Sequence, residues 1–99
     1  MVTDREKEKF AQSIEKWGIV SQILMLAEES GELTVAALHY VRNKKQVEAE
    51  DHLAEEIADV ELMIDEIKFA LLLGTKVQAY RETKLERLEQ YLARARALF

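Results

Sequence analysis

The sequence predicts an all-α domain of four helices. It has no proline and only three glycines among 99 residues, so tight turns must be few. Apolar residues recur at steps of three and four along most of the chain, which is the spacing of one face of an α-helix. Long helices with short connections are expected to pack as an antiparallel four-helix bundle. A chain of this length forms one domain, and we assign residues 1–99 to it.

Composition and charge argue against several classes of protein. Without cysteine, the chain has no disulfide framework and no thiolate chemistry. The net charge of −5, with acids and bases interspersed, does not suit binding to nucleic-acid backbones. The first residues are charged and lack the apolar core of a signal peptide. No apolar run approaches the roughly 20 residues that span a bilayer. We therefore expect a soluble, cytoplasmic protein that binds neither nucleic acid nor membrane.

The first helix is expected to begin at Asp4, because Thr3 and Glu6 have the spacing of a capping box. Apolar residues continue it at helical spacing as far as Trp17, and Gly18 is a plausible break.

Two neighbouring stripes run along a second predicted helix, residues 19–42: one is the predicted core and the other carries acids. In the acidic stripe, Glu29 and Glu32 interrupt positions that are otherwise mostly apolar, such as Met25 and Ala36. A solvated charged face would not normally place acids beside such residues. The first stripe is the predicted core, and it consists of Ile19, Ile23, Leu26, Leu33, Ala37 and Tyr40.

The third predicted helix, residues 47–73, repeats this arrangement. Glu56 and Asp59 lie on a stripe that also holds His52 and Met63. The adjacent predicted core stripe consists of Leu53, Ile57, Val60, Ile64, Ile67 and Leu71.

A last helix is expected from about residue 76 to near the end of the chain, after a stop at Gly74. Lys84 and Arg87 lie three residues apart on it, so they share one face. They form either a solvated basic face or a pair that reaches phosphate oxygens. The apolar seam of this helix consists of Leu85, Leu88, Leu92, Ala95 and Phe99.

Apolar residues cover more than one face of the two central helices. Residues 19–27 are apolar nearly all round, and Leu62, Phe69 and Leu73 add a further face to the third helix. Gly31 inside the second helix costs about 1 kcal/mol relative to alanine, which close approach by another backbone or by a ligand would offset. A single small bundle would leave such faces wet, so a homodimer or homotetramer is expected.

Two acidic pairs, each three residues apart, are the features that suggest chemistry. If the two central helices are antiparallel, their four carboxylates converge and repel one another unless something neutralises them. A hard divalent cation bound by oxygen, Mg²⁺ or Mn²⁺, is the usual solution. A di-iron bundle needs Glu-x-x-His pairs, but alanine lies three residues before both His39 and His52. We therefore interpret these histidines as packing or surface residues.

The acidic residues also carry a family resemblance. Glu28-Glu29-x-x-Glu32, a spacer of 23 residues and Glu56-x-x-Asp59 resemble the MazG motif. The flanking segments KWGIVSQILMLAEESGEL and ADVELMIDEIKFAL strengthen the match, which covers roughly residues 10–92. The resemblance implies an all-α nucleoside triphosphate pyrophosphohydrolase that releases a nucleoside monophosphate and pyrophosphate. Similar enzymes include dimeric dUTPases, dCTP pyrophosphatases and phosphoribosyl-ATP pyrophosphatase.

Carried over by position, the resemblance implies that Glu29, Glu32, Glu56 and Asp59 are Mg²⁺ ligands. Mn²⁺ is the expected substitute. Glu28 matches the first acid of the motif, and it is expected to orient or deprotonate the attacking water.

The expected substrate contacts come from elsewhere in the chain. Lys84 resembles the basic residue with which family members hold phosphates on the last helix. Many members carry asparagine or arginine four residues later, whereas this chain has Leu88, so Arg87 is the candidate replacement. Trp17 is either a core or interface anchor or a wall on which a base stacks. Base specificity is expected from Trp17 and Gln22, with other residues of the first helix or of a partner chain.

Three alternatives to a general nucleotide pyrophosphohydrolase remain from the sequence. Two are enzymes of the same kind, a phosphoribosyl-ATP pyrophosphatase and a dUTPase or dCTPase. The third is a non-catalytic helical interaction module with acids that merely face solvent. That module would carry its acids on a wholly polar stripe, unlike the stripes described above.

Overall fold

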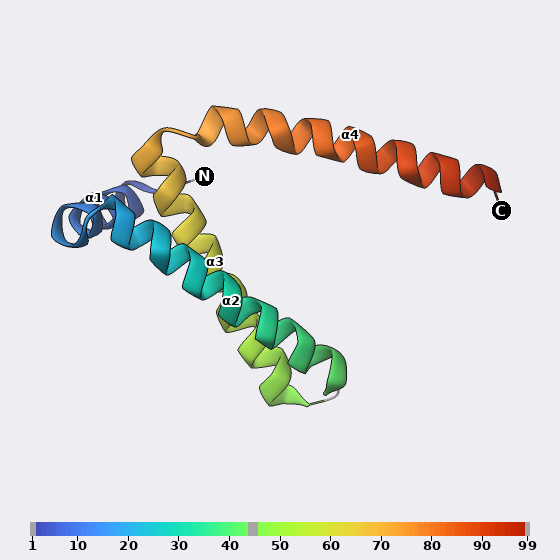
Figure 1. Cartoon of the computed structure of the whole chain (residues 1–99), viewed down its shortest axis with the longest axis horizontal. Coiled ribbons are helices and arrows are strands. Elements are labelled where there is room, and N and C mark those ends of the chain that lie inside the picture. The colour runs from blue at the N-terminus through green and yellow to red at the C-terminus, as the bar shows by residue number, and fades with distance from the viewer. Residues whose placement is uncertain (1, 44–45, 99) are drawn as a thin grey trace.

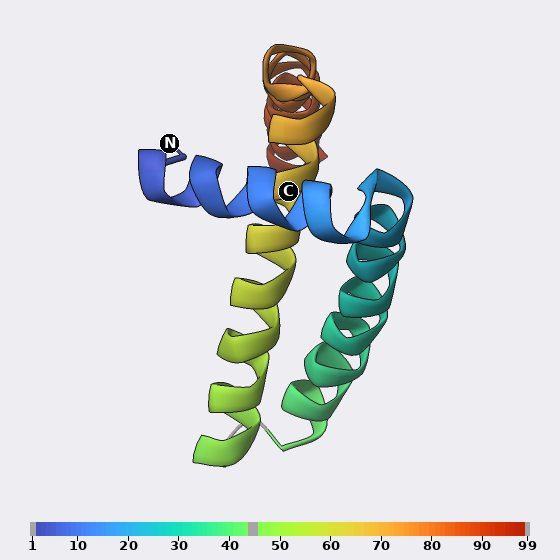
Figure 2. The same cartoon turned by 90° about the vertical axis from the view of Figure 1, so that its left-hand side faces the viewer.

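The computed structural model describes residues 2–43 and 46–98, and these form four helices without any strand. Figure 1 labels each helix, and Figure 2 shows α1 along its length. The predicted all-α class and the number of helices are confirmed. The helices are α1 (Asp4–Trp17), α2 (Ile19–Arg42), α3 (Val47–Leu71) and α4 (Gly74–Leu98).

Helix α1 has the predicted capping box at its start. The backbone N–H of Glu6 donates to Thr3 Oγ1 (3.1 Å), and the backbone N–H of Thr3 donates to Glu6 Oε1 (2.9 Å). The hydrogen bond from the Thr3 backbone, followed by the Thr3 side chain, lowers the pKa of the Glu6 carboxyl group. The helix ends where Gly18 adopts φ 85°, a conformation that favours glycine. The predicted break is confirmed, and it lets α1 run across the ends of α2 and α3 (Figure 2).

Helices α2 and α3 lie side by side in opposite directions and form the main packing unit of the chain (Figures 1 and 2). Ala36 and Ala49 are fully buried, and Phe10 of α1 packs on Phe69 of α3 with ring centroids 6.1 Å apart. Small side chains let two helices approach closely. None of the helices in the described ranges is long and apolar enough to cross a membrane.

The buried surface of α2 and α3 includes residues of the acidic stripes as well as part of the predicted core stripes, of which Val60 and Ile67 are buried. Gln22 and Glu56 are buried, whereas Ile23 and Ile57, from the predicted core stripes, are each 41% exposed. Two helices cover only one strip of each other's surface, so the adjacent apolar stripe remains partly open. This geometry places carboxylates inside the helix pair.

A tight turn separates α3 from α4. Helix α3 ends at Leu71, two residues earlier than expected, because Leu72 takes the left-handed conformation with φ 54°. The backbone N–H of Leu73 then closes the turn by donating to Lys68 O (2.9 Å). The prediction that Gly74 stops α3 is therefore wrong, because Gly74 is the first residue of α4.

Beyond this turn, α4 projects away from the other helices (Figure 1) and, among the described residues, packs against α3 alone. The radius of gyration is 17.1 Å, whereas a compact domain of this length has about 13 Å.

Candidate metal centre

Three carboxylates from the two central helices converge on one point. Glu29 and Glu32 come from α2 and Glu56 from α3, and one oxygen atom from each lies within 4.8 Å of the others. Residues three apart share a helix face, and the antiparallel pairing brings α3 opposite that face. The structure therefore brings together three of the four predicted metal ligands.

Two of these side chains hold buried oxygen atoms with no partner. Glu56 is only 7% exposed and Glu29 is partly buried. Oε2 of each is buried and accepts no hydrogen bond within the described part of the chain. A buried oxygen atom without a partner is costly, and a bound cation removes that cost. All the donors are carboxylate oxygens, so the site suits Mg²⁺ or Mn²⁺ better than zinc.

The raised pKa values of two of these carboxyl groups also favour a bound cation. Burial raises the pKa of Glu29, and the charges of Glu32, Asp59 and Glu56 raise it further. Burial also raises the pKa of Glu56, followed by the charges of Glu32 and Asp59, while His52 acts in the opposite direction. The cluster is thus destabilised when it is fully ionised, and a divalent cation would reverse this effect.

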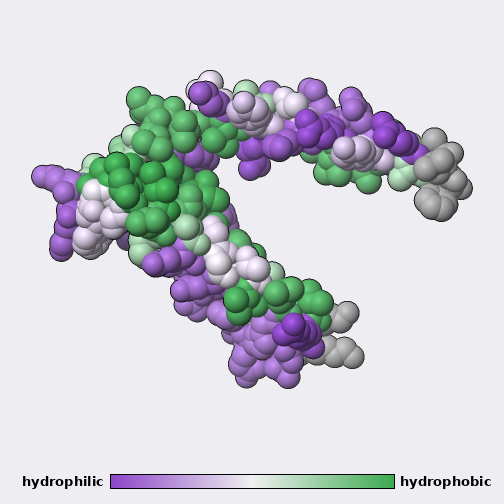
Figure 3. Space-filling model, in the orientation of Figure 1, coloured by the Kyte–Doolittle hydropathy of each residue, from purple (hydrophilic) through white to green (hydrophobic). Residues whose placement is uncertain are grey.

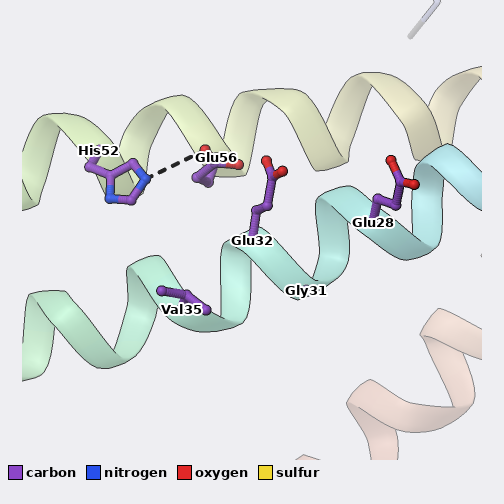
Figure 4. A pocket seen from close by; sticks show the side chains of 6 residues that line it. All are labelled: Glu28, Gly31, Glu32, Val35, His52 and Glu56. Carbon is purple, nitrogen blue, oxygen red and sulfur yellow. Dashed lines mark ion pairs between the residues drawn. The ribbon is translucent and has the colours of Figure 1, made fainter.

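Asp59 and Glu28 lie beside the three converging carboxylates. Asp59 is partly buried one turn beyond Glu56, near enough to raise the pKa of both Glu29 and Glu56 but outside the tight cluster. Glu28 is exposed and lines a pocket of about 600 Å³. In Figure 4, Glu28 and Glu32 reach from α2 toward α3. The pocket is lined by Glu28, Gly31, Glu32, Val35, His52 and Glu56.

His52 is a site residue that the sequence interpretation missed. Its Nε2 atom lies 3.5 Å from Oε1 of Glu56 and forms an ion pair when the imidazole is protonated (Figure 4). Its ring also lies edge-on to His39 of α2, with centroids 6.3 Å apart. The signal was available in the sequence, because His52 precedes Glu56 by four residues and therefore shares its helix face.

Trp17 and Gln22 line no part of this pocket. Trp17 is 57% exposed near the end of α1, where the ammonium group of Lys16 lies 5.3 Å from its ring centroid. Gln22 is buried against Glu66 of α3. In the amide orientation that satisfies both groups, Gln22 Nε2 lies 3.2 Å and 2.6 Å from the two Glu66 oxygens. Burial raises the pKa of Glu66, and a hydrogen bond with Ser13 partly offsets this.

Lys84 and Arg87 also lie outside the pocket in a single chain. Both are exposed on α4, which extends away from the pair of central helices (Figure 1). Lys84 lines a shallow groove on α4 that also contains Leu85 and Leu88.

Comparisons with protein-family models, with curated proteins and with solved structures find no match to this chain.

Proposed function

We propose that this chain is a Mg²⁺-dependent nucleoside triphosphate pyrophosphohydrolase, with Mn²⁺ as a possible substitute. The single observation that carries the proposal is the convergence of Glu29, Glu32 and Glu56 from two antiparallel helices, with two buried oxygens that have no partner in the described ranges. The spacing of these acids is also the spacing of the MazG-like motif. The products would be a nucleoside monophosphate and pyrophosphate, as expected of an enzyme that clears nucleotides from the pool.

Each acid has a role that follows from its position. Glu29, Glu32 and Glu56 would hold the ion, and Asp59 would complete its surroundings from the next turn of α3. The bound ion supplies neutralisation of phosphate charge and a more acidic water molecule. Glu28 is exposed at the pocket, where its carboxylate can orient and deprotonate the attacking water. No covalent nucleophile is needed.

The proposed functional form of this chain is a homodimer or homotetramer. The support is the exposed apolar surface of α2, α3 and α4, which a monomer would leave in water. Lys84 and Arg87 would bind phosphate oxygens, because a net charge of −5 otherwise repels a triphosphate.

A nucleotide panel with Mg²⁺ tests the activity. The panel contains the common ribo- and deoxyribonucleoside triphosphates and phosphoribosyl-ATP, and the assay scores pyrophosphate against orthophosphate. Glu56→Gln is the matched inactive control, because it keeps the size of the side chain but removes its charge. Preference for dUTP, dCTP or phosphoribosyl-ATP would identify the narrower enzyme classes.

A non-catalytic interaction module is the competing proposal, and the exposed apolar surface favours it as well. It predicts no release of pyrophosphate from any nucleotide and no difference between the wild-type chain and Glu56→Gln.

A further inference from the structure

An exposed apolar stripe runs along α2 on the side opposite the buried Gln22 and Ala36. Its large members are 54–71% exposed. They recur at the spacing of one helix face, and Gly31 lies in the middle of the stripe. No atom of the described residues lies within 4 Å of the place where a Cβ atom of residue 31 would be. The stripe, which we call the outer α2 stripe, consists of Val20, Leu24, Gly31, Val35, Leu38 and Val41.

Helix α4 has an apolar seam that its own chain leaves uncovered. Leu85, Leu88 and Leu92 are 50–57% exposed. Among the described residues, α4 packs only on α3. Figure 3 shows apolar patches on the side of α4 that faces the central helices and on the edge of those helices that faces α4, with an open angle between them.

The exposed area of the chain is larger than that of a compact monomer. The accessible surface is 8189 Å² for 11.5 kDa, whereas a compact protein of this mass exposes about 5,800 Å². The excess, about 2,400 Å² per chain, matches what an obligate dimer buries. A second copy can therefore account for the open angle.

Charge favours a second copy over a neutral apolar partner. Residues 74–98 contain six Lys or Arg and three Glu, a net charge of +3. Residues 1–73 contain eight Lys or Arg and sixteen Asp or Glu, a net charge of −8. The basic α4 of one copy therefore attracts the acidic residues 1–73 of another copy. In a dimer with a two-fold axis, this contact forms twice.

We propose that α4 of one copy docks on the outer α2 stripe of a second copy and completes the second copy's pocket. Gly31 and Val35 belong both to the stripe and to the lining of the acidic pocket. A helix on the stripe therefore lies at the mouth of that pocket. Lys84 and Arg87 are within one turn of Leu85 and Leu88. Docking of the seam on the stripe therefore brings their charges close to the acids that line the second copy's pocket.

The role given to Lys84 and Arg87 rests on the proposed function, whereas the docking of α4 does not. The site is then composite: the carboxylates come from one copy and the basic residues from the other. This explains why a single chain keeps its phosphate-binding candidates far from its metal-binding candidates.

The docking is tested by molar mass, without any assay of activity. The wild-type chain should sediment at twice 11.5 kDa or a higher even multiple at micromolar concentration. Leu88→Glu on the seam and Leu38→Glu on the stripe should each shift the mass toward that of the monomer. Gln90→Glu, which adds the same charge on the opposite face of α4, is the matched control and should not. Far-ultraviolet circular dichroism reports whether each variant keeps its helices.

The composite site is tested by mixing two inactive variants. Glu56→Gln removes one carboxylate of the cluster, and Lys84→Ala with Arg87→Ala removes the basic residues. If α4 acts in trans, co-refolded mixtures should regain about one quarter of wild-type activity, because half of the random dimers contain one intact site out of two. If α4 acts in its own chain, mixing restores nothing.

The outcomes separate the two proposals. A monomeric wild-type chain, or Leu88→Glu and Leu38→Glu variants that both remain folded dimers, would overturn the docking. Dimers that are active but show no complementation would overturn the composite site. A wild-type chain that hydrolyses no nucleotide would contradict the proposed function, while the mass measurements would still decide how α4 docks.

Discussion

His52 Nε2 lies 3.5 Å from Oε1 of Glu56, while Oε2 of the same carboxylate is buried without a hydrogen-bond partner among residues 2–43 and 46–98. The two residues are four apart on α3, so the helix itself fixes this relationship. Engagement of one oxygen by the imidazole leaves the other oxygen free to bind a cation together with the carboxylates of α2. A partner of this kind orients a metal ligand without touching the metal.

We expect His52→Ala to weaken the binding of Mn²⁺ by about tenfold, because the Glu56 carboxylate loses its orienting partner. Isothermal titration calorimetry of the apo protein measures this directly. His52→Gln should restore part of the affinity, because an amide N–H can still donate to the carboxylate. His39→Ala is the matched control: it removes the neighbouring ring, for which the structure shows no contact with Glu56. Equal losses in both alanine variants would contradict the orienting role.

The free energy of unfolding should depend on pH in a way that divalent cations abolish. The pKa values of Glu29 and Glu56 are raised above their ordinary 4.5 in the folded chain. Such groups bind protons more tightly when folded, so their stabilising contribution is full below pH 4.5 and is lost as the pH rises through the raised pKa. Without a cation, urea unfolding should show stability falling from about pH 4.5 towards neutral pH.

Two controls accompany this measurement. Glu56→Gln cannot ionise, so it should flatten the fall, whereas Glu61→Gln on the exposed side of α3 should leave it unchanged. Added Mn²⁺ should restore stability at neutral pH, because the ion binds the ionised cluster only in the folded state. Stability that rises over the same range without a cation would argue against the repulsive cluster.

The proposed reaction predicts where the oxygen of water appears. Attack of water at the α-phosphorus places the new oxygen in the monophosphate, with pyrophosphate as the leaving group. Hydrolysis in water labelled with heavy oxygen, followed by mass spectrometry, should therefore find the label in the monophosphate alone. Label in pyrophosphate would indicate attack at the β-phosphorus. Formation of the diphosphate and orthophosphate would indicate γ-phosphate hydrolysis instead.

Much of the fold could be predicted from the sequence because its signals are local. Thr3 and Glu6 cap α1 through their own hydrogen bonds, and Gly18 breaks the helix because its φ of 85° suits glycine. The turn at Leu72 could not be predicted in this way. A leucine in the left-handed conformation has no propensity signal, and the hydrogen bond from Leu73 to Lys68 that closes the turn is visible only in three dimensions.

The acids of the candidate site could be predicted from local helix periodicity, but the pairing of the other polar residues could not. Glu29, Glu32 and Glu56 follow from helix periodicity and one antiparallel pairing. Gln22 shares their stripe, but its amide is taken by Glu66, an acid that the periodicity did not single out as a buried partner. Which polar groups pair with each other depends on the register of α2 against α3, and periodicity alone does not specify that register.

Gln22 provides a prediction that separates structure from substrate binding. Gln22→Leu leaves the buried Glu66 carboxylate without its amide donor, so it should lower the free energy of unfolding by about 1–3 kcal/mol. Gln22→Leu combined with Glu66→Leu should recover much of this loss, because neither polar group remains. Chemical denaturation of the wild-type chain, the two single variants Gln22→Leu and Glu66→Leu, and the double variant measures the coupling. A folded Gln22→Leu variant of unchanged stability but altered KM would instead support contact between Gln22 and the base.

Substitutions at Gly31 distinguish an isolated chain from one on which a second copy docks. A Cβ at this position meets nothing within 4 Å in the part of the chain that the structure describes. Gly31→Ala should therefore stabilise α2 by about 0.8–1 kcal/mol and Gly31→Leu by nearly as much. If α4 of a second copy crosses the stripe at Gly31, a leucine there holds the helices apart, so Gly31→Leu should weaken the dimer. Urea unfolding at two protein concentrations, with light scattering, distinguishes these results. Ser30→Leu adds a similar side chain one residue away on another exposed face and should leave the dimer intact. Stabilisation by Gly31→Leu with an unchanged molar mass would show that no helix docks at Gly31.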